Sequence, residues 1–276
     1  MTSTSAWARF WDLGRWWKAV IAVVVYLVLY QLGALLVGTL FGNRIDSKNL
    51  FANASSVFFG LGAPLIIGAI LLILFLLSVG WIKPTFAGQP VNRPRWMWIF
   101  VVLAAIPIVL RLIGINYGSY ASGVVITTFV IGLFIGFTEE LLYRGIVVRI
   151  LRNGGHSERV VAVVSSLLFG LSHLTNLASG QPIGTVALTV LFTFGFGMMM
   201  YLVMRATGNI VWAMVIHALT DPTTFLASGG VDVASTSTSP LLSFAGPFNI
   251  VFVVAALIAI IFIRGRVETG RAAAAA

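Results

Sequence analysis

The sequence of 276 residues contains no cysteine and little charge. The lack of cysteine excludes disulfides, cysteine-based zinc sites, thiol nucleophiles and iron–sulfur clusters. Charged residues make up 9 % of the chain, whereas about a quarter of an ordinary soluble domain is charged. Hydrophobic residues make up 59 %. The composition therefore predicts an all-α polytopic membrane protein, because in lipid an open span satisfies its backbone as a helix.

Apolar stretches of about 20 residues, long enough to cross a bilayer, recur along the whole chain. Short breaks rich in Gly, Pro and Asn separate them. We expect eight spans in total, at residues 16–42, 56–82, 96–114, 122–152, 159–177, 183–204, 209–227 and 242–263.

The net charge of +9 comes from basic residues in the short breaks, where Lys and Arg mark the cytoplasmic side. This distribution predicts contact with membrane lipids and no nucleic acid. If the N-terminus is inside, the opposite side keeps Arg44 and Lys48, and Arg111 snorkels to the outer interface. We therefore expect a multi-pass protein of the cytoplasmic membrane with both termini cytoplasmic. The basic residues of the cytoplasmic side are Arg9, Arg15, Lys18, Lys83, Arg93, Arg95, Arg144, Arg149, Arg152, Arg159, Arg205, Arg264, Arg266 and Arg271.

Three segments are expected along the chain. Residues 1–121 carry a signal anchor and accessory transmembrane helices, since the first span is too long for a signal-peptide core. Residues 122–227 form the core helices, which hold the intramembrane polar groups. Residues 228–276 form a Gly/Ser/Thr-rich outer loop, the last helix and a cytoplasmic tail.

Two adjacent acids, Glu139 and Glu140, lie in the otherwise apolar fourth span within the stretch FTEELLYRGIVVR. Their burial carries a large desolvation cost, so we interpret them as a functional site. Glu140 and Arg144 are four residues apart and share a helix face, whereas Glu139 is turned about 100° away. We expect Arg144 to pair with Glu140 and leave Glu139 free. The alternative is a purely structural ion pair that locks helices together.

Later spans contribute His173, four residues after Phe169, and His217, four residues before Asp221. At a rise of about 1.5 Å per residue, Glu140 and His173 lie roughly 20 Å from the nearest cytoplasmic break, and His217 roughly 12 Å. Intramembrane ionisable groups normally face the bundle interior. We therefore expect one shared buried site that opens toward the cytoplasm.

These residues form three motifs in order, EExxxR, FxxxH and HxxxN/D. They are made by Glu139, Glu140 and Arg144, by Phe169 and His173, and by His217 and Asp221. Over residues 122–227 the set resembles the CPBP (Abi) family, which comprises type II CAAX prenyl endopeptidases and bacterial relatives in bacteriocin processing or self-immunity. The resemblance implies an intramembrane endopeptidase that acts on a membrane-associated or lipidated, CAAX-like peptide.

The resemblance also implies roles for the site residues. Glu139 would be the general base and His173 its partner in activating water, with His217 and Asp221 on the oxyanion side. Many family members have Asn where this chain has Asp221. Asp221 then either donates as a neutral acid or orients His217. A third reading makes it an ordinary residue at a helix end before Pro222.

Cofactor use and catalysis have alternatives at this level. Glu139, His173 and His217 could hold a divalent metal such as zinc, or the site could use none, as in a glutamate protease. A non-catalytic binding or bacteriocin-immunity protein could use the same cavity to capture a peptide or lipopeptide. A proton-coupled transporter, the less favoured reading, would use Glu139 and Glu140 as a relay.

Overall fold

The computed structural model describes residues 5–231 and 239–268, and within them every regular element is a helix. Over these two ranges, eight helical segments are long and apolar enough to cross a membrane, which confirms the predicted fold class. Their boundaries lie within three residues of those expected from hydropathy. Residues 232–238 of the outer loop and residues 269–276 of the tail lie outside the described residues. The segments are Trp16–Arg44, Ala54–Val79, Arg95–Gly114, Val124–Asn153, Glu158–Leu177, Ile183–Thr207, Ile210–Ser228 and Pro240–Phe262.

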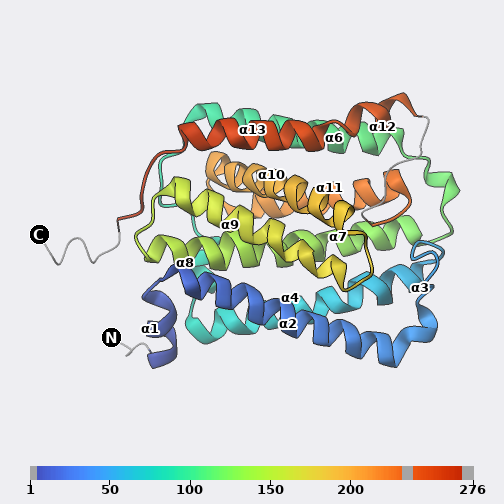
Figure 1. The fold of residues 1–276 in the computed structure, drawn as a ribbon, viewed down its shortest axis with the longest axis horizontal. Coiled ribbons are helices and arrows are strands. Elements are labelled where there is room, and N and C mark those ends of the chain that lie inside the picture. Colours follow the sequence, from blue (N-terminus) through green and yellow to red (C-terminus); the bar gives the residue numbers. More distant parts are fainter. Residues whose placement is uncertain (1–4, 232–238, 269–276) are drawn as a thin grey trace, which may run out of the picture.

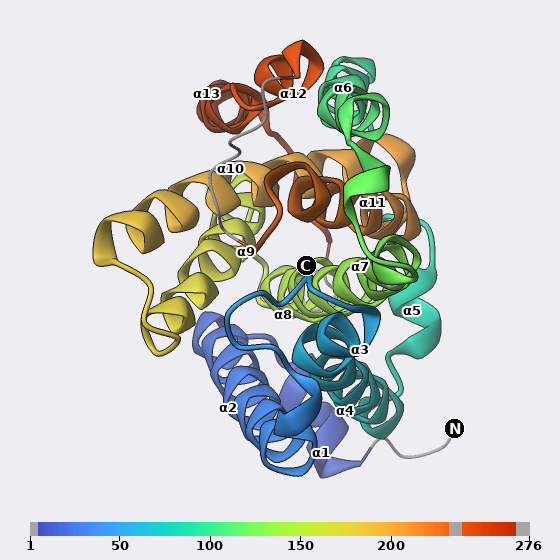
Figure 2. The ribbon, with the colours of Figure 1, turned by 90° about the vertical axis from the view of Figure 1, so that its right-hand side faces the viewer.

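The long helices run roughly along one axis and form a bundle in three groups (Figures 1 and 2). α2 (Trp16–Phe41) and α4 (Ala63–Val79) lie on one side. α6 (Trp98–Gly114) and α13 (Phe248–Phe262) lie on the other. The central group consists of α7 (Val124–Glu140), α9 (Glu158–Ser172), α10 (Ile183–Thr207) and α11 (Ile210–Ser228).

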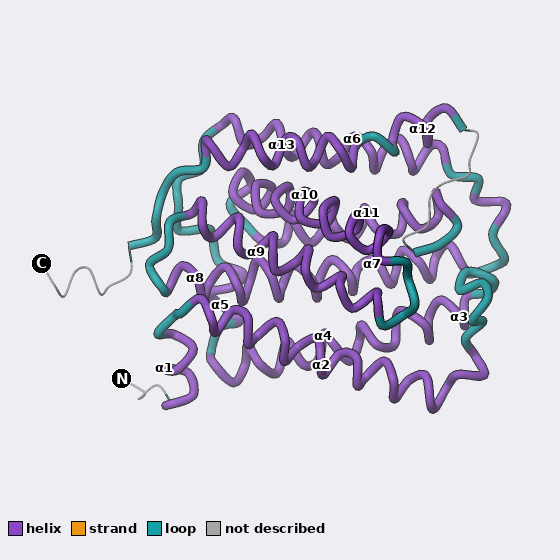
Figure 3. The backbone as a smooth tube through the Cα atoms, viewed as in Figure 1, coloured by secondary structure: helices purple, strands orange, loops and turns teal. Residues whose placement is uncertain are grey.

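The two ends of the bundle differ in what they carry. The described chain begins near α1 (Ala6–Asp12) and finishes after α13 at the same end, which we call the terminal end. The loop at residues 153–157 also lies there. The other end, which we call the remote end, carries the connections at residues 42–53, 115–123 and 178–182. Figure 3 shows these connections as short loops between helices.

α7 and α11 approach each other closely because α7 carries Gly132 and Gly136 on one face. A Cβ atom at Gly136 would lie 2.7 Å from the backbone nitrogen of Ala218, inside the contact distance of real side chains. α11 also continues through Pro222 to Ser228. The reading of Asp221 as a residue at a helix end is therefore wrong, and neighbouring helices accommodate the proline within the span.

The fourth span changes its helical geometry immediately after the two acids. α7 ends at Glu140, and the next seven residues, η5 (Leu141–Val147), are π-helical before α8 (Val148–Asn153) completes the span. π-helical turns often occur at functional sites. Here the turn contains Arg144 and begins directly after the EE pair.

Charged residues close the terminal end of the central group. Arg152 Nη2 lies 2.7 Å from Glu158 Oε2, and Arg205 Nη1 lies 3.2 Å from the same oxygen. The Tyr201 hydroxyl donates to this oxygen over 2.5 Å. Arg152 and Arg205 were expected among the basic residues that mark the cytoplasmic side. The structure shows them buried and paired, so they lie inside the bundle.

Candidate active site

Glu140 connects two helices at the centre of the bundle. Its carboxylate is fully buried, and Oε1 lies 3.1 Å from Arg144 Nη1 and 2.7 Å from His217 Nδ1. Arg144 also donates through Nη2 to the carbonyl of Gly197 over 2.6 Å. The predicted pairing of Glu140 with Arg144 is confirmed. The structure adds a second partner, His217. This residue lies on another helix, so spacing within one helix could not predict the contact.

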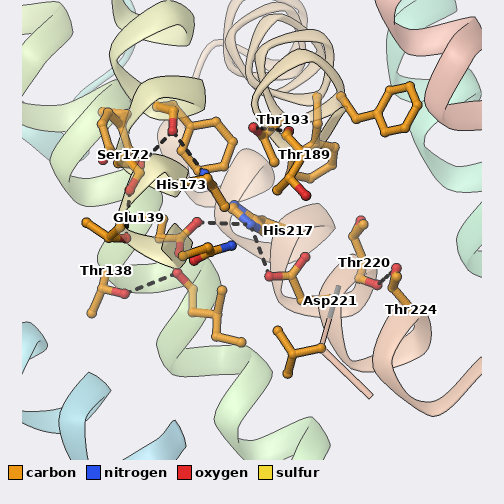
Figure 4. A pocket seen from close by; sticks show the side chains of 18 of the residues that line it. Thr138, Glu139, Ser172, His173, Thr189, Thr193, His217, Thr220, Asp221 and Thr224 are labelled. Atoms are coloured by element: carbon orange, nitrogen blue, oxygen red, sulfur yellow. Dashed lines mark hydrogen bonds and ion pairs between the residues drawn. The ribbon is translucent and has the colours of Figure 1, made fainter. Parts of the chain in front are cut away.

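Glu139 faces a cavity and does not pair with Arg144. About 29 % of its side-chain surface is exposed, and Oε2 lies 3.5 Å from His217 Nε2. Asp221 Oδ2 lies 3.6 Å from the same nitrogen. Figure 4 shows Glu139, His217 and Asp221 directed toward one another on the cavity wall. Each nitrogen of the buried His217 ring thus faces carboxylate oxygen, with Glu140 on one side and Glu139 and Asp221 on the other.

His173 is the capping residue directly after α9, and it lines the same cavity. Its Nδ1 lies 3.1 Å from the backbone carbonyl of Phe169. A carbonyl oxygen can only accept, so this contact requires the proton on Nδ1 and leaves the Nε2 lone pair of neutral His173 available. The imidazole of His173 can therefore accept a proton or a hydrogen bond through Nε2.

Phe169 supports three charged or polar groups of the site. Its ring centroid lies 5.2 Å from that of His173 and 5.9 Å from that of His217. The guanidinium carbon of Arg144 lies 4.9 Å from the same centroid, within the range of a cation–π contact. The ring thus lies beside His173, as the spacing of four residues indicates, and it also packs against the other two motifs.

The cavity has a volume of about 670 Å³ and extends from Glu139 and His217 toward the remote end. Its wall includes Leu61 and Val231, and both residues lie near the remote end of the bundle. The prediction of a site open toward the same side as the termini is therefore wrong. The terminal half is closed because residues 198–204 of α10 are fully buried there.

The metal reading gains no support from the arrangement of donors. Within the described residues, no group of three or more His, Cys, Asp or Glu side chains is placed to hold a metal ion. The candidates Glu139, His173 and His217 line one cavity, but they do not form such a group. His217 is engaged by carboxylates on both nitrogens. We therefore derive no chemical step through a metal.

Several cavity residues were missed by motif reasoning, although their spacing carried a signal. Tyr26 and Tyr30 lie four residues apart in the first span. Thr185, Thr189 and Thr193 recur every four residues on α10, which places them on one helix face. Periodic hydroxyl groups in an apolar span indicate a polar interior face.

The position of Arg111 differs from the one predicted from the sequence. It was expected to snorkel to the interface, yet its side chain is 7 % exposed and lines the cavity. The remote end of α6 packs against the short helix α12 (Pro240–Ala245), where a Cβ at Gly114 would lie 3.0 Å from Leu242. Arg111, near this end, therefore lies inside the bundle.

A comparison with known protein families gives a match to part of the chain. Residues 121–223 match a family model described as type II CAAX prenyl endopeptidase Rce1-like. No curated protein matches the chain. The matched segment runs from the loop before α7 into α11, and it contains all three motifs and the acids, arginine and histidines described above. Over residues 121–223 the chain is thus similar to the Rce1-like type II CAAX prenyl endopeptidases, in agreement with its resemblance to the CPBP family.

Proposed function

We propose that this protein is an intramembrane endopeptidase of the glutamate type. One observation carries the proposal: the partly exposed Glu139 carboxylate lies beside His217, which Glu140 and Arg144 hold in place from the buried side. A general base must reach the cavity, whereas its supporting groups must not move. Glu139 meets the first requirement and Glu140 the second.

The geometry supports hydrolysis by an activated water. Glu139 removes a proton from water, with His173 Nε2 accepting a hydrogen bond from the same molecule, and the water oxygen bonds to the scissile carbonyl carbon. Protonated His217 donates through Nε2 to the oxyanion that forms. The C–N bond then breaks, and the proton held by Glu139 passes to the leaving nitrogen. The carboxylate of Asp221 lies 3.6 Å from Nε2 of His217 and orients the ring.

The substrate we propose is a membrane-associated or lipidated, CAAX-like peptide. A second pocket of about 340 Å³ lies between α2 and the 3₁₀ turn η6 (His173–Leu177). It shares Leu27, Gln31 and Thr175 with the main cavity, and the rest of its wall is formed by Val28, Leu32 and Leu35. An apolar pocket beside the reaction site suits a hydrocarbon chain. We place the protein in the cytoplasmic membrane, with lipids and lipopeptides as its partners.

The rival functions make different demands on the cavity. A proton-coupled transporter needs access from both ends of the bundle, whereas this cavity extends to one end and residues 198–204 fill the other half. A binding or immunity protein needs the cavity but not a reactive carboxylate. Glu139 favours the enzyme because its carboxylate reaches the cavity without being neutralised by Arg144.

The test is cleavage of a quenched lipopeptide library by the purified full chain in detergent. We expect cleavage by the native protein, and its loss in Glu139→Gln and His173→Ala. Glu268→Gln is the matched control, because Glu268 is an exposed carboxylate at the terminal end. Equal cleavage by the native protein and Glu139→Gln would overturn the mechanism. Peptide binding without any cleavage would favour the immunity function.

A further inference from the structure

Arg111 is a buried cation that the proposed chemistry does not use. It lies in the last turn of α6, its side chain is 7 % exposed, and it forms part of the cavity wall. A guanidinium in the interior of a membrane protein is costly and marks a functional position by default. A guanidinium in this position requires an anionic partner.

In the described part of the chain, three other arginines are buried as deeply, and each has oxygen acceptors. Arg144 binds Glu140 and the carbonyl of Gly197. Arg152 and Arg205 both bind Glu158. Arg111 differs, because among the described residues its guanidinium makes no hydrogen bond and no ion pair. The carbonyl end of α6 favours a cation but provides no hydrogen bond to it.

The surroundings of Arg111 are polar but nearly free of negative charge. Asp221 is the carboxylate whose field reaches Arg111, and its oxygen atoms stay beyond ion-pair distance. That carboxylate is directed at His217 instead. Neutral hydroxyl and amide groups line the same cavity, including Thr220, Thr224 and Asn249. Such a wall can solvate a ligand oxygen without competing for the guanidinium.

From these contacts we propose that Arg111 binds a carboxylate of the peptide substrate. The planar guanidinium presents paired N–H donors, which match the two oxygens of a carboxylate. Asp221 links Arg111 to the reaction site, because it lies next to His217 Nε2. The carboxylate would therefore lie on the remote-end side of the scissile bond, within a few residues of it. Arg111 then determines specificity for peptides with a nearby free C-terminus, a conclusion that rests on the proposed peptidase function.

The carboxylate could come from the C-terminus or from an Asp or Glu side chain, and matched peptides separate these sources. We would measure KM and kcat for one peptide as the free acid, as the C-terminal amide, and as the amide with a Glu at the last position. For the native protein we expect a KM about tenfold lower for the free acid than for the amide, since a hydrogen bond to a charged group is worth at least one factor of ten. If the amide with Glu is favoured equally, the side chain is a sufficient source.

The variants are Arg111→Gln and Arg111→Lys. We expect Arg111→Gln to raise the KM of the free acid to about that of the amide, which removes the preference for the free acid. Arg111→Lys should keep part of it, because lysine retains charge but loses the paired geometry. Arg95→Gln is the matched control, as Arg95 is exposed at the other end of the same span. An unchanged acid-to-amide ratio in a folded Arg111→Gln protein would overturn the proposal.

A binding measurement separates failure of this proposal from failure of the peptidase function. Fluorescent acid and amide peptides are titrated into Glu139→Gln, and into the same variant with Arg111→Gln added. If the acid binds more tightly than the amide, and this difference disappears in the double variant, the role of Arg111 is supported even if no peptide is cut. Cleavage of both peptides with no acid preference in either assay leaves the peptidase function standing and rejects the role of Arg111. If Arg111 were only a counter-ion of Asp221, both peptides would be cleaved with no preference for the acid.

Discussion

His217 Nδ1 lies 2.7 Å from Glu140 Oε1, although 77 residues separate them in the chain. This contact joins α11 to the end of α7, and Arg144 Nη1 binds the same carboxylate oxygen at 3.1 Å. The two neighbouring glutamates consequently have different surroundings. Glu140 is locked between two partners, while Glu139 keeps a cavity-facing carboxylate.

We predict that Glu140→Gln and Glu139→Gln separate stability from catalysis. Removing one partner of a buried ion pair costs about 3–5 kcal/mol of unfolding free energy, so Glu140→Gln should unfold at a clearly lower temperature and lose activity. Glu139→Gln should lose cleavage while its unfolding temperature stays close to that of the native protein. Thermal unfolding in detergent and peptide cleavage measure both quantities. Equal destabilisation by the two substitutions would contradict the assigned roles.

Gly136→Ala is expected to separate α7 from α11. The added methyl group meets the backbone of Ala218, and overpacking of this kind costs about 1–3 kcal/mol. The displacement should also weaken the contact between His217 and Glu140, so cleavage should fall more than the loss of folded protein explains. Gly38→Ala is the control, because a Cβ at Gly38 would meet no atom within 4 Å. A native-like rate in Gly136→Ala would show that the helix spacing does not matter for catalysis.

Chelation should leave peptide cleavage unchanged. The described residues present no three-ligand metal group, and His217 Nε2 already faces Glu139 and Asp221 at 3.5 and 3.6 Å. The measurement is the cleavage rate before and after dialysis against a strong chelator, followed by addition of zinc. A rate that is lost on dialysis and recovered with zinc would replace the glutamate mechanism by a metal-dependent one.

The orientation of the bundle decides from which side the substrate enters. With the basic terminal end in the cytoplasm, the cavity extends toward the outer side of the membrane. The chain has no cysteine, so single substitutions give unique labels. We expect a membrane-impermeant maleimide to label Lys48→Cys in intact cells, and to label Lys83→Cys after permeabilisation alone. Both lysines are exposed. Lys48 lies in the connection at residues 42–53 of the remote end, and Lys83 lies in α5 (Ile82–Phe86), which Figure 3 shows near the terminal end. The reverse pattern would place the cavity mouth on the cytoplasmic side.

The spans and the local pairs of the site could be predicted from the sequence. Hydropathy located eight spans to within three residues, because a bilayer requires about 20 apolar residues per helix. Helical periodicity placed Arg144 against Glu140 and Phe169 against His173, because residues four apart share a face. Span length and the spacing of residues within one helix are both set by the order of residues, so the sequence alone predicts them.

Tertiary packing alone decided how the helices share their polar groups. The contact of His217 with Glu140 depends on how closely α7 and α11 approach, which Gly136 sets by the absence of a side chain. The direction of the cavity depends on which half of the bundle is filled, and depth along one helix says nothing about that. Arg111 shows the same limit: its position near a helix end predicted exposure, whereas the helices around it place its side chain in the cavity wall. A single span specifies where a group lies along the membrane normal, but only neighbouring spans determine what it faces.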